Sequence, residues 1–177
     1  MIINIYFKNS IERGSGRLSA VIPVGHDNFV PSDKIVAILS KDTRAVKPMI
    51  SKAELNQRLI KASFGRTVRS VILTSDNYIV LSALKPKTLA DRYLEETQLP
   101  IFSCGGDNHI PNAQVAAILK KNSEPILEMI KLARANDKVI NARMGKPVKG
   151  IIVTSSGYFI LSFLSPETIA KKRYSKS

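Results

Sequence analysis

The sequence predicts an α+β protein made of two tandem homologous units, each a small, mainly antiparallel sheet with two helices. The first observation is an internal repeat: Val24–Leu94 aligns without a gap on Cys104–Tyr174, at an offset of eighty residues. The second is that each copy alternates short apolar runs, bounded by turn residues, with a longer segment of helical periodicity. Two copies are too few for a solenoid, so we expect a duplicated small domain.

Each unit is expected to follow the order β-β-α-β-β-β-α. Its short apolar strand lies at Ile35–Leu39 in the first copy and at Val115–Leu119 in the second. A helix follows, over about Lys47–Gln57 and Glu124–Asn136, and the second copy shows an apolar stripe at i, i+3, i+4 and i+7. Ser123 is the expected N-cap of that second helix.

The rest of each unit is predicted to be a strand, a cationic turn, a hairpin and a closing helix. In the first copy these are a strand at Arg58–Ser63 and a hairpin of Val71–Thr74 with Tyr78–Ala83. The hairpin strands are apolar at nearly every position, so we expect both of their faces to be covered. The closing helices should begin at Pro86 and Pro166, because proline is favoured in the first helical turn.

These elements set the expected domain boundaries. Residues 1–17 have no counterpart in the second copy and form an N-terminal extension, in which Ile2–Phe7 is a candidate extra strand. The first unit takes residues 18–96 and the second takes 97–177, with the linker near Thr97–Pro100.

Charge is the unusual part of the composition. Lys and Arg number 27 against 14 Asp and Glu, which gives a net charge of +13 and a pI near 10.0. Such a field attracts nucleic acid, an anionic membrane surface or an acidic protein, and it says little about the fold.

The compartment predicted from the sequence is the cytoplasm. Cys104 is the single cysteine, so the chain has no intrachain disulfide, as is common in a reducing cytosol. The N-terminus lacks the pattern of a signal peptide, and no apolar run approaches the roughly 20 residues that span a bilayer. We therefore expect no membrane partner.

Residues with catalytic or ligand chemistry form no recognisable constellation. His26 and His109 are not equivalent in the two copies, and Cys104 is expected to be a small strand residue. The run Gly145-Lys146-Pro147 lacks the Ser or Thr of a phosphate-binding P-loop, and the repeated Gly-Asp-Asn indicates a turn that caps its own backbone. We expect no enzyme, no metal, no cofactor and no small-molecule ligand.

A cationic turn recurs in both copies and is the candidate binding feature. It lies in Leu59–Arg69, LIKASFGRTVR, and again in Val139–Lys149, VINARMGKPVK, where Gly65 corresponds to Gly145. Each copy reads as a strand that runs into a glycine turn and then into a buried strand. If the protein binds a polyanion with specificity, we expect it to do so mainly here.

The charges of this turn differ between the copies. Arg66 and Arg69 flank the first turn, whereas Lys146 and Lys149 flank the second. An arginine offers a planar fork that grips phosphate or guanine bidentately, while a lysine offers a point charge. The plain alternative is that all four are solvated side chains of a hairpin in a basic protein.

Aromatic residues give little sign of a platform for stacking single strands. Tyr78 and Tyr158 fall in the predicted core hairpins, where we expect them to pack, and no exposed aromatic residue is evident. An RNA-stacking surface is therefore a weaker interpretation than a duplex-binding one.

Three motifs together resemble a known family. Met49-Ile50, then LIKASFGRTVRSVI, then IVLSALKPKTLADR are similar to the small bacterial extracellular matrix regulatory protein A (RemA) family. That family has Met-Ile in a helix, an Ala-Thr-Tyr-Gly-Arg-Arg-Thr-Arg turn and a closing Ile-Leu-Ser-Ala…Pro-Glu-Thr. The resemblance covers both copies, more closely in the first.

The resemblance implies a DNA-binding transcriptional regulator of biofilm matrix genes, acting as a ring-like homo-oligomer of one-unit subunits. Double-stranded DNA is then the expected partner. Carried over by position, the family's DNA-contacting arginines fall on Arg66, Thr67 and Lys34, of which only Arg66 keeps its identity. The second copy has Lys146, Pro147 and Gln114 at these places, and Arg69 and Lys149 match a further basic position.

Two alternatives stay open at this point. One is an oligomeric scaffold whose basic faces bind an acidic protein partner, which the replacement of the family's arginine pair in both copies favours. The other is RNA binding. A pull-down from nuclease-treated lysate separates the first from DNA binding, and competition with duplex DNA separates the second.

Overall fold

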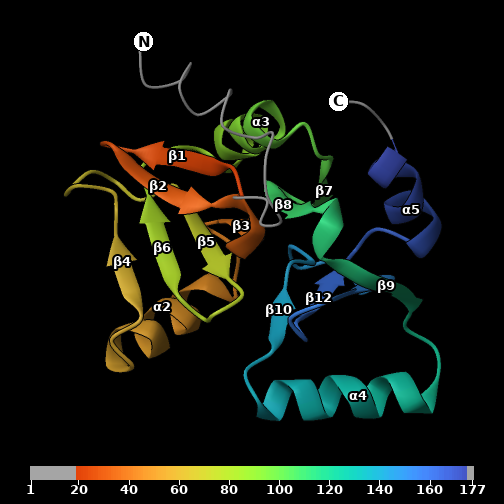
Figure 1. Ribbon diagram of the computed structural model, residues 1–177. Coiled ribbons are helices and arrows are strands. Elements are labelled where there is room, and N and C mark those ends of the chain that lie inside the picture. Colours follow the sequence, from red (N-terminus) through yellow and green to blue (C-terminus); the bar gives the residue numbers. More distant parts are fainter. Residues whose placement is uncertain (1–18, 175–177) are drawn as a thin grey trace, which may run out of the picture.

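Both halves of the chain fold into the same succession of elements in the computed structural model, which describes residues 19–174. The first unit contains β1 (Val21–Gly25), β2 (Asn28–Pro31), a 3-10 turn (Ser32–Lys34), β3 (Ile35–Ser40), α2 (Val46–Leu55), β4 (Leu59–Lys61), β5 (Ser70–Thr74), β6 (Ile79–Ser82) and α3 (Pro86–Thr97). The second contains β7 (Ile101–Gly105), β8 (Asn108–Pro111), a 3-10 turn (Asn112–Gln114), β9 (Val115–Lys120), α4 (Glu124–Ala135), β10 (Val139–Asn141), β11 (Gly150–Thr154), β12 (Phe159–Ser162) and α5 (Pro166–Tyr174). The α+β class and the tandem repeat are thus confirmed (Figure 1).

The prediction missed one strand in each unit. The repeated Gly-Asp-Asn is indeed a turn, but it closes a hairpin between β1 and β2, and between β7 and β8. The unpredicted strands β2 and β8 are four residues long and end in a proline, so they show no alternation long enough to detect. The expected extension of residues 1–17, with its candidate strand Ile2–Phe7, lies outside the described residues.

Helix boundaries follow the capping signals within two residues. The closing helices begin at Pro86 and Pro166 as predicted. Ser123 occupies the N-cap position of α4, yet its side chain makes no capping hydrogen bond. The helices α2 and α4 end at Leu55 and Ala135, slightly before the predicted ends.

The strands are mainly antiparallel and form three sheets. Their orders are β4-β6-β5-β3-β8-β7, β10-β12-β11-β9 and the two-stranded β1-β2. Only the β4–β6 and β10–β12 pairs in the described chain are parallel. The largest sheet draws on both units, because β8 of the second unit joins β3 of the first at Ile38 and His109.

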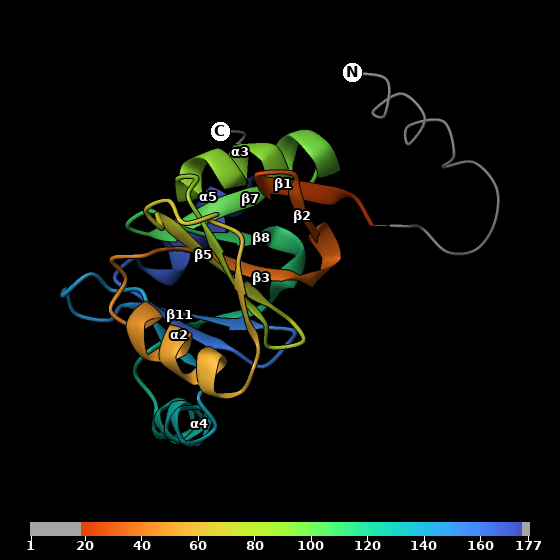
Figure 2. The ribbon, with the colours of Figure 1, turned by 90° about the vertical axis from the view of Figure 1, so that its left-hand side faces the viewer.

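The central strands β5 and β6 are buried on both faces, as their apolar sequence predicts. Ile72 packs with Leu89 and Tyr93 of α3 on one face, and Leu73 packs with Val46 of α2 on the other. Figure 2 shows α3 and α2 on opposite sides of this sheet. None of the helices in residues 19–174 is long and apolar enough to cross a membrane.

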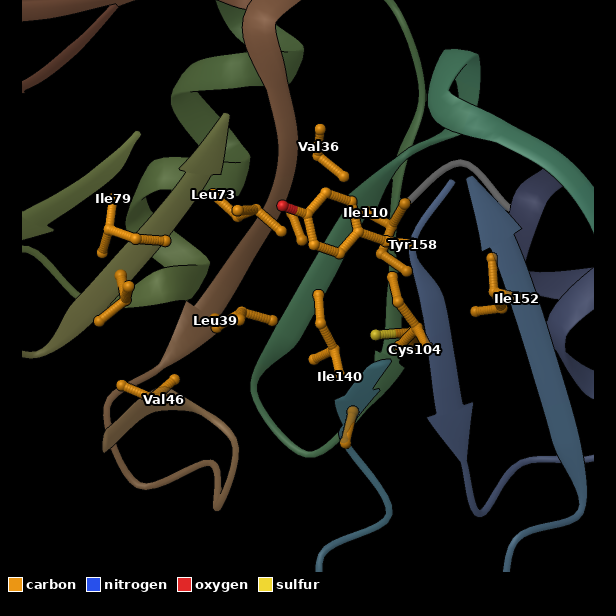
Figure 3. Packing of buried hydrophobic residues seen from close by; sticks show 14 of the residues in the cluster. Val36, Leu39, Val46, Leu73, Ile79, Cys104, Ile110, Ile140, Ile152 and Tyr158 are labelled. Atoms are coloured by element: carbon orange, nitrogen blue, oxygen red, sulfur yellow. The ribbon is translucent and has the colours of Figure 1, made fainter. Parts of the chain in front are cut away.

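One hydrophobic cluster continues from the first unit into the second. It includes Val36 and Leu73 of the first unit with Ile140 and Tyr158 of the second. Figure 3 shows the ring of Tyr158 among these side chains. The two units therefore share one hydrophobic core across their junction and are not independent domains.

The tyrosine prediction is right for Tyr158 and wrong for Tyr78. Tyr158 is 5% exposed, because the first unit packs against it, whereas Tyr78 is 36% exposed. In the described chain no unit packs on Tyr78 as the first unit packs on Tyr158. The guanidinium of Arg58 lies 5.1 Å from the centroid of the Tyr78 ring instead.

A buried asparagine fixes the β7–β8 hairpin to the first unit. The Oδ1 of Asn108 accepts hydrogen bonds from the backbone N–H of Ser40 at 3.0 Å and from the hydroxyl of Thr43 at 2.7 Å. Its Nδ2 donates to the carbonyl of Gly105 at 2.8 Å. The counterpart in the first unit, Asn28, is exposed and bonds only within its own turn, through Nδ2.

We expect Asn108→Ala to destabilise the protein by about 2–4 kcal/mol, because it leaves the Thr43 hydroxyl and the Ser40 N–H without their acceptor in a buried place. The matched control is Asn28→Ala, for which we expect a loss below about 1 kcal/mol, since its groups reach water. Urea denaturation followed by circular dichroism measures both. Equal losses would show that the buried bonds across the junction contribute nothing extra.

Candidate nucleic-acid interface

The first cationic loop, residues 62–69, crosses the end of β6 instead of closing a hairpin. It leaves β4, which is parallel to β6, and enters β5, which is antiparallel to β6. Phe64 and Gly65 take positive φ values of 52° and 73°, and the N–H of Arg66 donates to the carbonyl of Ser63 at 3.0 Å. A positive φ at this point favours glycine, and the space around Gly65 is open.

The two arginines of this loop point away from the core. Arg66, Thr67 and Arg69 are exposed, whereas Val68 between them is half-buried against the core. The backbone N–H of Arg69 donates to the carbonyl of Ser82 at 2.9 Å, which holds the end of the loop on β6. The loop therefore presents two guanidinium groups on a fixed backbone.

The second cationic loop, residues 142–149, has the same backbone arrangement. Met144 and Gly145 have φ values of 52° and 76°. The N–H of Lys146 donates to the carbonyl of Arg143 at 3.0 Å, and that of Lys149 donates to the carbonyl of Ser162 at 3.0 Å. Lys146, Pro147 and Lys149 are exposed, and the Nζ of Lys146 lies 4.4 Å from the centroid of the Phe163 ring. The two loops thus share a backbone conformation and differ in their charged groups, which are guanidinium in the first and ammonium in the second.

A continuous series of contacts connects the two loops along one side of the molecule. The side chain of Met144 lies against Gly106, at the tip of the β7–β8 hairpin. From that tip Asn108 bonds to the turn after β3, where the N–H of Lys41 donates to the carbonyl of Arg69 at 3.2 Å. Lys41 is exposed as well. We call this surface the cationic face: Lys41, Arg66, Arg69, Lys146 and Lys149.

Lys34 does not belong to the cationic face within one chain. It ends the 3-10 turn before β3, and its carbonyl accepts from the N–H of Ser75 at 2.9 Å. The β3–β5 ladder runs from Ile35 opposite Thr74 to Ser40 opposite Ser70. At about 3.3 Å per residue this ladder is roughly 16 Å long, with Lys34 beyond one end and the first cationic loop beyond the other. The sequence places Lys34 next to β3, but it does not show that this end of β3 lies opposite to the cationic loops.

The second-unit counterpart of Lys34, Gln114, is equally remote from the loops. Its carbonyl accepts from the N–H of Ser155 at 2.9 Å, and its Nε2 donates to the carbonyl of Asp33 at 3.3 Å. The two 3-10 turns therefore meet at the junction, on the end of the sheet opposite to the cationic face.

An exposed aromatic residue that the sequence analysis did not find lies at the tip of the first loop. Phe64 is 79% exposed, so the prediction that no exposed aromatic residue is present is wrong. Its ring stacks on that of His26 with centroids 5.2 Å apart. Its place next to Gly65, inside the turn and beyond the predicted strand, was the signal that would have found it.

Neither buried titratable side chain of the second hairpin adds charge to this surface. Burial lowers the pKa of His109, against the opposing effect of Asp107, so its ring is neutral at pH 7. Burial also raises the pKa of the Cys104 thiol to about 12, as suits a packed strand residue. No group of three His, Cys, Asp or Glu side chains in the described chain is placed to hold a metal ion.

Comparison with known proteins supports the tandem arrangement. The profile of a family described as "RemA-like: Extracellular matrix regulatory protein A-like" matches residues 21–93 and again residues 101–172. A relative from Thermotoga petrophila, named "Putative regulatory protein", is 40% identical over 75 residues, which are 42% of this chain and 82% of the relative. Relatives of the same name from Desulforudis audaxviator and Microcystis aeruginosa are 36% identical over 50% and 47% of this chain, and 93% of each relative.

Proposed function

This chain belongs to the RemA-like family as two tandem units, and from that premise we propose that it is a regulatory protein that binds double-stranded DNA through its cationic face. The observation that carries the proposal is the pair of loops built alike, with exposed cations on one side of the molecule. The family's description supports a role in regulating genes of the extracellular matrix.

The physical basis is attraction to phosphate, with added grip from arginine. Arg66 and Arg69 each carry a fork that bonds two phosphate oxygens, or the O6 and N7 of guanine, at once. Lys146 and Lys149 supply attraction without that geometry. The first unit is then the more specific of the two, and the second adds affinity through its charge.

Support for a homo-oligomer comes from comparing the junction between the two units with the surfaces of each unit that face away from it. In the described residues β8 pairs with β3, whereas the equivalent β2 pairs only with β1, and β9 pairs only with β11. Phe29 of β2 and Met129 of α4 are 56% and 45% exposed, although their counterparts His109 and Met49 lie at the junction.

A second copy can therefore add its β2 to β9 as β8 adds to β3. Such a head-to-tail contact is heterologous, and it closes into a ring if its rotation does. A ring repeats the cationic face at each subunit, so that many weak phosphate contacts sum to a large avidity. We include this assembly in the proposed function.

We predict that Arg66→Ala with Arg69→Ala weakens duplex binding by roughly tenfold or more, because two bidentate groups are lost. The matched variant is Lys146→Ala with Lys149→Ala, which removes the same charge and should cost less. A gel-shift titration at fixed salt measures both losses. If the two pairs lose the same affinity, the proposed asymmetry between the units is wrong.

DNA binding should also fall steeply as salt rises. Counterion release predicts a log–log slope of about −0.9 for each phosphate neutralised. The Arg66→Ala, Arg69→Ala variant loses two charges, so the magnitude of its slope should be smaller by about 1.8. Fluorescence anisotropy of a labelled duplex measures it, and a flat response, or no binding at low salt, excludes the DNA proposal.

Assembly can be tested at the edge strand. We expect Phe29→Asp to reduce the solution mass to that of a single chain, because it places a charge in the proposed β2–β9 contact. Leu55→Asp is the matched control, since Leu55 is an exposed apolar residue at the end of α2 and belongs to neither of the strands proposed to pair. Light scattering coupled to gel filtration measures the mass. A wild-type protein that is a single chain at micromolar concentration would contradict the assembly.

A further inference from the structure

A cavity of about 610 Å³ lies at the junction between the two units. Its apolar lining comes from both units: Met49, Ala53 and Leu73 from the first, with Val139 and Leu161 from the second. Small-molecule sites in proteins have volumes of about 300–1,000 Å³ and combine an apolar lining with a few polar groups. The size and the lining of this cavity fit that description.

Positive charge is concentrated around this cavity. Arg44, Lys52 and Arg58 line it from the first unit, and Arg134 and Lys138 line it from the second. Asp137 is the one carboxylate among the lining residues, and it pairs with Lys52. The surplus of cations gives the cavity a strong preference for an anion.

The overall basic composition does not account for this concentration. At the equivalent positions of the other unit, Arg44 is replaced by Glu124, Lys52 by Leu132, and Arg134 by Glu54. Only Arg58 and Lys138 correspond to each other. The charge is therefore a feature of the inner junction, and it is absent from the outward-facing surfaces that repeat its backbone.

One cation of the cavity is fixed and partly removed from water. The Nζ of Lys138 donates to the Oδ1 of Asn77 at 2.9 Å and lies 4.0 Å from the centroid of the Tyr158 ring. The hydroxyl of Tyr158 donates to the same oxygen at 2.7 Å. Burial lowers the pKa of Lys138, and an anion beside it would offset that cost. The bond to Asn77 uses one of the three donors of the ammonium.

We propose that this cavity binds a small organic phosphate of nucleotide size, held between the two units. Its phosphates would lie against Arg44, Arg134 and Lys138, because guanidinium forks match phosphate oxygens in pairs. Its apolar part would lie on Met49 and Ala53. A ligand bound to both units would stabilise the junction that sets the spacing of the two cationic loops; this last step rests on the proposed function.

The test uses the full chain and N-methylanthraniloyl-ATP as the probe, followed by fluorescence anisotropy at about 0.15 M salt, where long-range surface attraction is largely screened. We expect saturable binding that inorganic pyrophosphate displaces. Linear, unsaturable binding overturns the site, and failure of pyrophosphate to displace the probe overturns the phosphate class.

Two variants test whether the probe binds in this cavity. Arg134→Gln with Lys138→Gln should weaken its binding by at least about tenfold, since two charge-assisted hydrogen bonds are lost. Lys138 also bonds to Asn77, so its replacement could disturb the structure as well as the site. A second variant, Arg44→Gln with Arg134→Gln, changes only exposed side chains and should also weaken binding of the probe. Thermal unfolding of each variant confirms that it is folded.

The matched control is Arg66→Gln with Arg69→Gln, which removes the same charge from the cationic face and should change probe binding less than about twofold. Equal losses in the control and in the cavity variants would overturn the proposal, because they would indicate attraction to charge in general. The two proposals also separate here. Absence of DNA binding with probe binding intact contradicts the proposed function alone.

Discussion

Addition of the β7–β8 hairpin to the edge of β3 is the interaction on which the rest of this structure depends. It places Asn108 where its amide oxygen accepts from two groups of the first unit, and it buries Tyr158 in a core common to both units. An edge strand has free N–H and C=O groups that can pair with another segment, and here that segment belongs to the same chain. The hairpin also carries the tip that separates the two cationic loops, so the spacing of their charges is set by strand pairing rather than by a flexible linker.

Much of the fold followed from the sequence because the repeat doubled each signal. Gly65 and Gly145 recur at one offset, and both have a positive φ in loops of the same shape. The strands β2 and β8 did not follow, since a four-residue strand ending in proline has too little periodicity to detect.

The site was less predictable than the fold, for reasons of long-range placement. Local spacing predicted two exposed cations in each loop, and Arg66, Arg69, Lys146 and Lys149 are exposed. It gave no access to the position of Lys34, because that depends on which end of the β3–β5 ladder the 3-10 turn occupies. The charged cavity was equally out of reach, since its lining joins residues that lie more than eighty positions apart.

Fusion of the two units gives each junction its own chemistry. Inside the chain, Lys52 pairs with Asp137 and Asn77 accepts from Tyr158. At the corresponding positions of a chain-to-chain contact, Leu132 would face Gln57, and Gly157 would face Tyr78. The inner junction thus relies on specific polar partners, and the outer one would rely on apolar burial and main-chain pairing. Because an end that lacks Asp137 and carries Arg58 in place of Lys138 cannot reproduce the inner contacts, the two kinds of junction are not interchangeable. In the proposed assembly, subunits would separate between chains and not within them, so the chain keeps its two loops at a constant spacing whatever its oligomeric state.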